Sequence, residues 1–287
     1  MSRARAFVDL TKPGITLFIG VTAAAGFVTA RGGFSAPGQL ALMLTATMLM
    51  SGGAATLNQV AERRWDALMR RTSARPIPAG IITENGARRF GWALSIIGLG
   101  LSLLLLPWAT TMFLVLCHIS YVLVYTPLKR RTPLCTLTGA IPGALPVLAG
   151  WTAAGQAINV TAIALTGVLF MWQIPHFLAI GWMARDDYRI AGCPMLSVVE
   201  VTGRASARVS LAYAGAMLVC ATVVGFTSTA GSLYMGVAVL TSCAYIMHAW
   251  RFVQHPERAP ARRLFFSSIV VLPVLLTALM ADLALLG

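Results

Sequence analysis

Charged side chains are scarce in this chain, and carboxylates are the scarcest of them. Only 11% of the 287 residues are charged, with 9 Asp and Glu against 22 Lys and Arg, whereas 57% are hydrophobic. A water-soluble domain cannot cover so much apolar surface with so few polar side chains. The composition therefore excludes a soluble globular protein and predicts an all-α, polytopic membrane protein.

Cysteine pairs and polar linkers are also missing. The five cysteines are scattered and form no C-x-x-C pair, so neither a disulfide framework nor a zinc site is expected. The first apolar segment is followed by Arg31-Gly-Gly-Phe rather than by a small-x-small cleavage pattern, and we expect no cleavable signal peptide. Because no Ser/Pro-rich linker interrupts the apolar stretches, we expect one integral membrane domain over residues 1–287.

Long apolar runs are abundant. A transmembrane helix needs about 20 apolar residues to cross a hydrocarbon layer roughly 30 Å thick. Nine runs meet this requirement approximately, at 14–30, 38–58, 87–107, 109–127, 134–152, 160–183, 207–227, 232–250 and 265–286. An odd number of spans puts the two termini on opposite sides of the membrane.

The basic residues test this topology independently, because Lys and Arg are retained in short cytoplasmic loops. With nine spans, 21 of the 22 Lys and Arg share one side, and only Arg31 lies on the other. We therefore expect a cytoplasmic N-terminus, an external C-terminus and a location in the cell or inner membrane. The net charge of +13 is then mostly a topology signal, and no nucleic-acid partner is expected.

Four of the nine carboxylates lie in two clusters just past the second and the sixth expected spans. The first is Asn58-x-x-x-Glu62-x-x-x-Asp66, and the second is Arg185-Asp186-Asp187-Tyr188. On a helix, positions i, i+4 and i+8 lie along one stripe. The two clusters follow spans of the same orientation, which is a weak internal repeat and suggests paired sites facing each other. Two independently solvated loops are the alternative.

Oxygen ligands of this kind suit Mg²⁺, which takes one or two carboxylates and completes its shell with water and substrate phosphate oxygens. A diphosphate would also need basic partners. Candidates are Arg70, Arg71 and Arg75 in the 59–89 loop, and Lys129 and Arg130 in the 128–133 loop expected on the same side of the membrane. Each of these, taken singly, is equally well explained as a topology anchor at the membrane surface.

Four ordered motifs carry a resemblance to a known family. They are Asn58-x-x-x-Glu62-x-x-x-Asp66-x-x-Met69-x-Arg71-Thr72-x-x-Arg75-Pro76, Tyr125-Thr126-x-x-Lys129-Arg130, Trp172-Gln173-x-Pro175-His176-Phe177 and Asp187-Tyr188-x-x-Ala191-Gly192-x-Pro194-Met195-Leu196. Together they resemble the signatures of the protohaem IX farnesyltransferases, or haem O synthases, a branch of the UbiA-type intramembrane prenyltransferases. The match begins at Thr11-Lys12-Pro13 and covers nearly the whole chain.

The resemblance implies a bundle of about nine helices around a central cavity. It also implies transfer of a farnesyl group from farnesyl diphosphate to a vinyl group of haem b, giving haem O and diphosphate. Mg²⁺ would be held by Asn58, Glu62, Asp66 and Asp187, helped by Asp186. The diphosphate would be bound by Arg71, Arg75, Lys129, Arg130 and Tyr125. The enzyme that converts haem O to haem A, or a terminal oxidase, is the implied partner.

Polar residues inside spans are costly and suggest function. His176 lies in the sixth span beside Trp172 and Gln173, and it is the candidate to ligate haem iron or to bond a propionate. His118 lies in the fourth span. The alternative for either histidine is a hydrogen bond to a neighbouring helix.

Two other functions are compatible with part of the pattern. A quinone-pathway aromatic prenyltransferase would share both acidic motifs but would lack the Trp172–Phe177 block. A polytopic transporter would place its ionisable groups near mid-membrane on broken helices, whereas these acids cluster at one face.

Overall fold

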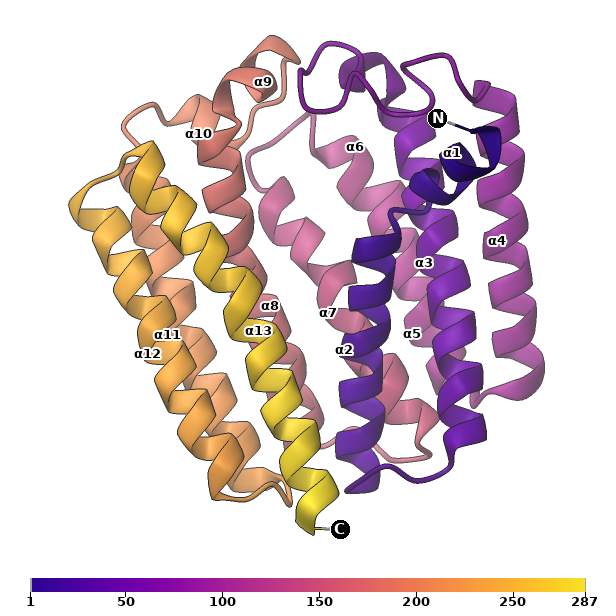
Figure 1. The fold of residues 1–287 in the computed structure, drawn as a ribbon, viewed down its shortest axis with the longest axis vertical. Coiled ribbons are helices and arrows are strands. Elements are labelled where there is room, and N and C mark those ends of the chain that lie inside the picture. The colour runs from indigo at the N-terminus through magenta and orange to yellow at the C-terminus, as the bar shows by residue number, and fades with distance from the viewer. Residues whose placement is uncertain (1, 287) are drawn as a thin grey trace.

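The computed structural model describes residues 2–286, and no strand occurs among them (Figure 1). The long helices run as α2 Pro13–Arg31, α3 Pro37–Asp66, α4 Glu84–Leu105, α5 Trp108–Ile119, α7 Cys135–Ala153, α8 Val160–Met183, α11 Arg204–Thr227, α12 Ser232–Gln254 and α13 Arg258–Leu286. Short elements connect them, namely α1 Arg3–Leu10, the π-helix η1 Ser120–Tyr125, α6 Thr126–Leu128, α9 Arg185–Ile190 and α10 Leu196–Val199. The all-α polytopic fold expected from the composition is confirmed.

Within residues 2–286, 8 helices are long and apolar enough to cross a membrane. One of them is the continuous stretch Trp108–Leu128, formed by α5, η1 and α6. The expected span 134–152 corresponds to α7, which is not among the 8 because glycines and the internal Pro142 and Pro146 lower its apolar content. α7 nevertheless packs between α2, α5 and α8 in the bundle.

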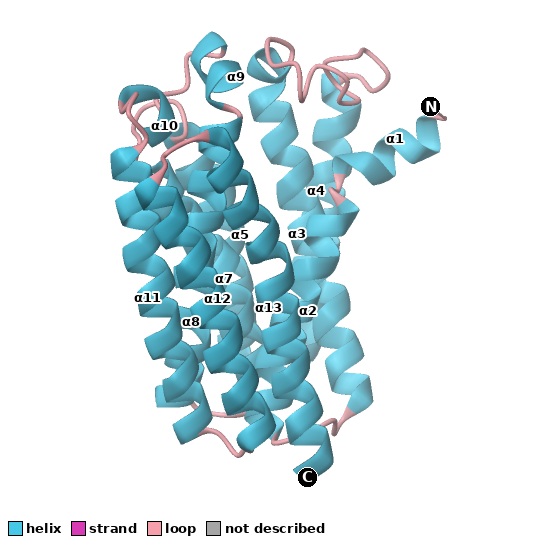
Figure 2. Ribbon diagram, turned by 60° about the vertical axis from the view of Figure 1, so that its left-hand side comes forward, coloured by secondary structure: helices cyan, strands magenta, loops and turns pink. Residues whose placement is uncertain are grey.

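The long helices lie roughly along one axis, and the two ends of the bundle differ (Figure 2). The loop after α3 and the short helices α1, α9 and α10 gather at the end that carries the N-terminus, whereas the C-terminus lies at the opposite end (Figures 1 and 2). The segments that contain both acidic clusters therefore share one end of the molecule.

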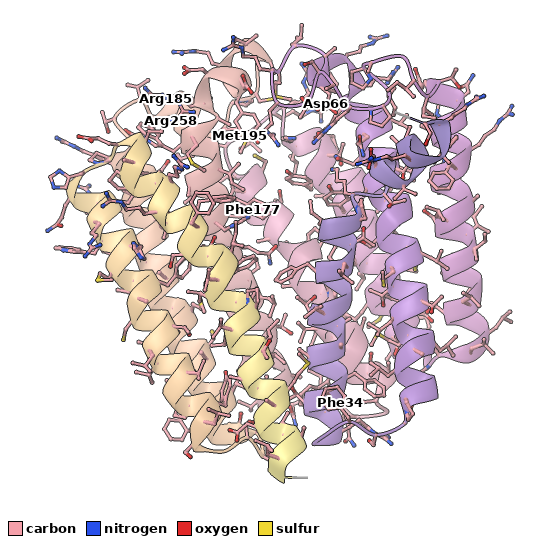
Figure 3. All side chains as sticks on the ribbon, in the orientation of Figure 1. Phe34, Asp66, Phe177, Arg185, Met195 and Arg258 are labelled. Atoms are coloured by element: carbon pink, nitrogen blue, oxygen red, sulfur yellow. The ribbon has the colours of Figure 1, made fainter. Side chains whose placement is uncertain are left out.

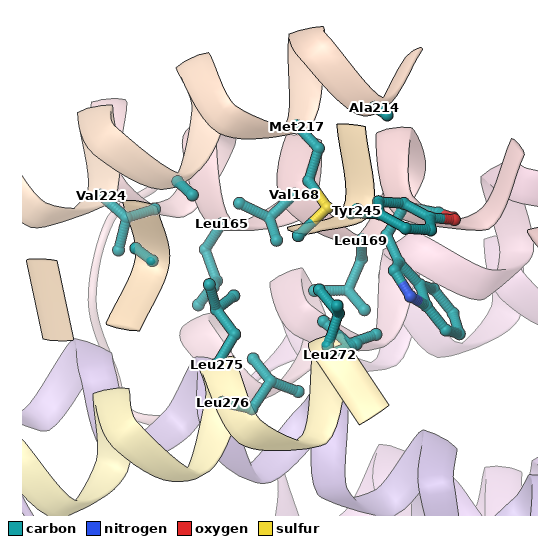
Figure 4. Close-up of a cluster of buried hydrophobic side chains, with 14 of the residues drawn as sticks. Leu165, Val168, Leu169, Ala214, Met217, Val224, Tyr245, Leu272, Leu275 and Leu276 are labelled. Atoms are coloured by element: carbon teal, nitrogen blue, oxygen red, sulfur yellow. The ribbon is translucent and has the colours of Figure 1, made fainter. Parts of the chain in front are cut away.

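Two apolar clusters hold the bundle together. The larger joins α8, α11, α12 and α13 through side chains such as Leu165, Met217 and Leu272 (Figure 4). The smaller joins α2, α3, α5 and α7 around Phe27 and Met43. Small residues let helices in this second group approach closely, as is common in membrane bundles.

α2 and α7 approach each other closely at two glycines. A Cβ atom at Gly26 would lie 2.2 Å from the carbonyl oxygen of Val147, and one at Gly150 would lie 1.9 Å from the carbonyl oxygen of Ala23. Backbone atoms cannot yield to such a contact as a flexible side chain could. Glycine at these two positions therefore sets the spacing of α2 and α7.

Replacement of Gly150 by alanine is expected to destabilise the protein, because the added methyl group must push α2 away from α7. Overpacking of this kind costs about 1–3 kcal/mol. The measurement is the thermal unfolding midpoint of the purified protein in detergent. Gly100→Ala on α4 is the matched control, since a Cβ at Gly100 meets nothing within 4 Å. Equal unfolding midpoints for the two variants would contradict the close approach of α2 and α7 at Gly150.

Candidate active site

A cavity of about 680 Å³ lies inside the bundle. Its walls are formed by α2, α3, α5, η1, α7, α8 and α13. One part is polar and is lined by Lys12, Asn58, Glu62, Arg71, Arg75, Tyr121, Tyr125, Lys129 and Tyr188. The rest is mainly apolar and includes Phe18, Leu114, Leu169, Phe177 and Ile269. Asp66 lies at the loop end of the bundle, and Phe177 lies deeper along α8 (Figure 3).

The first acidic cluster lies on the last turns of α3. Asn58, Glu62 and Asp66 are 1%, 5% and 0% exposed, and their spacing of four residues keeps them on one stripe about 12 Å long. The sequence prediction that these three residues share a stripe is therefore confirmed. Charged groups buried this deeply need partners.

Each residue of the stripe has a basic partner from a different element. Lys12, just before α2, donates from Nζ to Asn58 Oδ1 at 3.0 Å. Lys129, just after α6, contacts both oxygens of Glu62 at 2.9 and 3.0 Å. Arg75, in the loop after α3, donates to Asp66 Oδ2 at 2.6 Å. All three basic residues line the cavity.

Lys129 is a cation in this setting. Burial works to lower the pKa of its ammonium group, but the Glu62 carboxylate, which accepts from it through both oxygens, outweighs burial and holds that pKa well above the ordinary value. We call the polar part of the cavity the mouth. η1 and α6, which form the last part of the fourth span, carry the backbone to the mouth, and Lys129 follows them directly.

The second acidic cluster meets the first through the loop after α3. The Arg71 backbone N–H donates to Asp187 Oδ2 at 3.4 Å, and the Arg71 guanidinium donates to the Tyr188 hydroxyl at 3.4 Å. Asp187 and Tyr188 lie on α9, directly after α8. The loop after α3 therefore links the second cluster to Arg71, a residue that lines the cavity.

Four predicted site residues do not line the cavity. Asp66 and Asp187 bond to the lining residues Arg75 and Arg71, whereas the other two have partners elsewhere. Asp186 forms an exposed ion pair with Arg189, and it does not line the cavity. Arg130 stacks its guanidinium on the Trp65 ring, 3.6 Å from the centroid, and also lies outside the lining. In this arrangement neither residue offers an atom to a ligand in the cavity.

Sequence reasoning missed Lys12 as a site residue. Its backbone adopts a left-handed conformation with φ 50° and ψ 63°, which is unusual for a residue other than glycine. The only signal in the sequence was its place before Pro13 at the start of an apolar run. Tyr121 was missed as well, although its hydroxyl lies 3.4 Å from both Lys12 Nζ and Asn58 Oδ1.

Deeper in the cavity, the Trp172–Phe177 block lies on α8. Trp172 donates from Nε1 to the Ser268 carbonyl at 2.9 Å, and the His176 ring stacks on the Trp172 ring with 5.0 Å between centroids. Gln173 packs against Gly143. A Cβ atom added at Gly143 would lie only 1.9 Å from the amide oxygen of Gln173. Trp172, Gln173 and His176 all line the cavity, as predicted for one shared region.

The hydrogen bonds of Ser268 determine which nitrogen of His176 carries the proton. The Ser268 hydroxyl donates to the Phe265 carbonyl and lies 2.7 Å from His176 Nδ1. A hydroxyl has only one proton to donate, so Nδ1–H must be the donor to Ser268. Neutral His176 therefore keeps the lone pair of Nε2 for a ligand.

The donor set at the mouth fits Mg²⁺ bound together with a phosphate-containing ligand. Hard oxygen atoms come from Asn58, Glu62 and Asp66, and Asp66 Oδ1 is buried without any hydrogen-bond partner. Among residues 2–286, no group of three or more His, Cys, Asp or Glu side chains could hold a metal ion without help. Mg²⁺ usually takes only one or two carboxylates and completes its shell with water and phosphate oxygens.

Comparisons with known proteins agree with this geometry. Residues 19–270 match the UbiA prenyltransferase family. The chain is 38% identical over 277 residues to a protoheme IX farnesyltransferase of Opitutus terrae, covering 96% of this chain and 94% of the relative. It is 37% identical to that of Salinibacter ruber, covering 96% and 98%.

Solved structures share the fold at low sequence identity. A digeranylgeranylglyceryl phosphate synthase superimposes with a TM-score of 0.81 at 14% identity, covering 99% of both chains. A UbiA homologue of Archaeoglobus fulgidus, bound to GPP and Mg²⁺, has a TM-score of 0.67 at 14% identity and covers 96% of this chain and 99% of that one. The match over residues 19–270 and the relatives that align over nearly the whole chain show that it belongs to the UbiA prenyltransferase family and is an integral membrane prenyltransferase.

Proposed function

We propose that the chain, acting as a single membrane domain, transfers the farnesyl group of farnesyl diphosphate to a vinyl group of haem b. The first carbon of the farnesyl chain bonds to the outer vinyl carbon as its bond to diphosphate breaks, and water adds to the inner vinyl carbon with loss of a proton. The products are haem O, diphosphate and a proton, and the reaction depends on Mg²⁺. One observation carries the proposal: a single cavity joins a mouth rich in basic and acidic groups to an apolar interior that contains an available histidine nitrogen. The relatives named protoheme IX farnesyltransferase, which match over nearly the whole chain, support the same assignment.

The mouth is suited to hold a diphosphate leaving group. Arg71, Arg75 and Lys129 line it and would donate to the phosphate oxygens. Asn58, Glu62, Asp66 and Asp187 would hold Mg²⁺, which supplies positive charge where negative charge develops on the departing diphosphate. The Tyr125 hydroxyl, beside Lys129 in the same wall, offers a further donor.

The interior is suited to the two apolar reactants. Phe18, Leu114 and Leu169 contribute walls that exclude water, which protects an allylic cation from hydrolysis. His176 would bind haem through the free lone pair of Nε2, either at the iron or through a hydrogen bond. Trp172 and Gln173 would hold the orientation of the His176 ring and the shape of the wall.

The decisive assay uses protein purified in detergent and incubated with haem b, farnesyl diphosphate and Mg²⁺. A haem with the mass of a farnesylated product supports the proposal. A control incubation replaces haem b by an aromatic acid such as 4-hydroxybenzoate. Prenylation of that acid, with haem b left unchanged, would instead indicate a quinone-pathway prenyltransferase.

The product haem must leave the membrane interior for use elsewhere. We propose that it passes to an enzyme that converts haem O to haem A, or to a terminal oxidase, because an amphiphilic haem is poorly soluble in water. A direct contact with such an acceptor could be detected by crosslinking in the native membrane.

The end of the bundle that carries the N-terminus is proposed to face the cytoplasm, because all Lys and Arg except Arg31 belong to that side. A C-terminal alkaline phosphatase fusion is therefore expected to be active. The same reporter fused after Arg131, in the loop that follows α6, is expected to be inactive and serves as the matched control. The opposite pattern would reverse the proposed orientation.

A further inference from the structure

Each residue of the stripe on α3 bonds to a basic group, and Asp66 Oδ1 is the one carboxylate oxygen of the stripe that has no partner. Asn58 Oδ1 accepts from Lys12, both Glu62 oxygens accept from Lys129, and Asp66 Oδ2 accepts from Arg75. We call the two ionic contacts, Glu62–Lys129 and Asp66–Arg75, the counter-ion pairs. The three basic residues come from three different segments that converge on one stripe, so the arrangement is a property of the fold rather than of one loop.

The members of the counter-ion pairs would be needed by two different ligands. The oxygens of Glu62 and Asp66 suit a divalent cation, whereas the ammonium of Lys129 and the guanidinium of Arg75 suit a diphosphate. A cationic group bonded to a carboxylate weakens the attraction of that carboxylate for a divalent cation, and the carboxylate likewise weakens the attraction of the cationic group for a diphosphate. Neither ligand therefore binds at full strength while the pairs remain closed.

Binding of one ligand alone leaves buried charges behind. A divalent cation on Glu62 and Asp66 would displace Lys129 and Arg75, whose side chains are only 12% and 23% exposed. A diphosphate alone would draw the same cations away from carboxylates that are 7% and 0% exposed. A buried charge without a partner is strongly unfavourable.

We propose that this site binds the divalent cation and the diphosphate group cooperatively, by exchange of counter-ions. Lys129 and Arg75 move from the carboxylates to the diphosphate, and the released carboxylates take the cation. Each ligand thus provides the partner that the other one displaces. The inference rests on the proposed function only for the identity of the diphosphate substrate.

The same exchange assigns a role to Lys12. Asn58 Nδ2 donates to Thr126 Oγ1 at 3.0 Å, which fixes the amide so that its oxygen faces Lys12. The left-handed backbone at Lys12, with φ 50°, is the kind of strained conformation that persists where the surrounding structure holds a functional group in place. Lys12 is therefore a third cation for the diphosphate, and its ammonium group is released when the Asn58 oxygen takes the metal ion.

The test measures binding of Mn²⁺, which prefers the same oxygen ligands, to the detergent-purified full chain. The electron paramagnetic resonance signal of free Mn²⁺ is followed with and without farnesyl diphosphate, and a protein-free titration corrects for the complex formed in solution. We expect farnesyl diphosphate to tighten Mn²⁺ binding by about tenfold or more, within the roughly 5–150-fold range of coupled sites. By linkage, Mn²⁺ must tighten farnesyl diphosphate binding by the same factor.

Charge-neutral variants separate exchange from the general electric field of the mouth. Lys129→Gln and Arg75→Gln each free a carboxylate, so Mn²⁺ alone should bind about tenfold tighter than to the parent protein, and the coupling should shrink. Arg71→Gln is the matched control. The substitution removes the same charge from the same cavity, but the Arg71 guanidinium bonds to Tyr188 rather than to the stripe. It should change Mn²⁺ affinity far less.

The mirror variant is Glu62→Gln, which releases Lys129. Without metal, it should bind farnesyl diphosphate more tightly than the parent protein, although it loses Mn²⁺ affinity. Equal Mn²⁺ affinity of the parent protein with and without farnesyl diphosphate would overturn the proposal, and so would equal effects of Arg71→Gln and Lys129→Gln. The coupling in the parent protein needs no variant, so it remains decisive even if a substitution disturbs folding. Failure of haem farnesylation would leave these binding results intact and would refute only the proposed function.

Discussion

Asp66→Asn is expected to lower kcat/KM for farnesyl transfer by roughly 10²–10³-fold, the range seen when one charge-stabilising group is removed from an active site. Asparagine keeps the size of the side chain but removes its negative charge. That charge now pairs with Arg75 at 2.6 Å, and Asp66 Oδ1 is buried without a partner. The variant loses both the oxygen that suits the metal ion and the counter-charge of Arg75.

The measurement is steady-state formation of farnesylated haem at several Mg²⁺ concentrations. Asp186→Asn is the matched control, because Asp186 lies in the other acidic cluster yet is exposed and pairs with Arg189 at the surface. We expect that control to retain most of its activity. Activity of Asp66→Asn close to that of the parent protein at limiting Mg²⁺ would remove Asp66 from the site. A matching thermal midpoint would show that the loss arises from chemistry rather than from unfolding.

The class of fold could be predicted from the sequence because composition acts over the whole chain. Apolar runs and the distribution of basic residues give the spans directly, since the bilayer imposes both their length and their flanking charges. α7 is the weakest case. Its glycines and its Pro142 and Pro146 reduce the apolar signal, while its close contact with α2 depends on Gly150 and a neighbouring backbone that no local pattern reveals.

The candidate site was predictable where one helix carries it. Helical periodicity alone puts Asn58, Glu62 and Asp66 on one stripe, and the structure agrees. The contacts between segments were not predictable in the same way. The sequence positions of Lys12 and Arg75 do not predict that these residues bond to Asn58 and Asp66. These contacts depend on how the helices pack and on where the loops turn.

The surface position of Asp186 illustrates the same limit. In the sequence, Asp186 and Asp187 are adjacent and chemically equivalent. On the short helix α9, neighbouring side chains point about 100° apart, as 3.6 residues per turn require. Asp187 thus meets the Arg71 backbone, whereas Asp186 turns to Arg189. A run of two acids on a helix can place only one of them toward a given partner.

His176→Ala is expected to abolish haem binding and farnesyl transfer while retaining Mg²⁺-dependent binding of farnesyl diphosphate. The side chain lies in the cavity wall away from the counter-ion pairs, stacked on Trp172, and its Nε2 lone pair is the free ligand atom. Titration of haem b, followed by its absorption spectrum, measures the loss. Asp66→Asn should show the reverse pattern, with haem binding retained and metal-dependent binding of farnesyl diphosphate lost.

Two further variants test the physical basis of this division. Ser268→Ala keeps the His176 imidazole but removes the hydroxyl that lies 2.7 Å from its Nδ1. The ring then loses the contact that fixes its proton on Nδ1. Haem affinity should therefore fall, but by a smaller factor than in His176→Ala. His255→Ala, at an exposed position just after α12, should leave haem binding unchanged. A hydrogen bond between helices is the ordinary use of a histidine inside a membrane. An unaltered haem spectrum and haem affinity in His176→Ala would therefore leave His176 with a purely structural role, in which its bond to Ser268 joins α8 to α13.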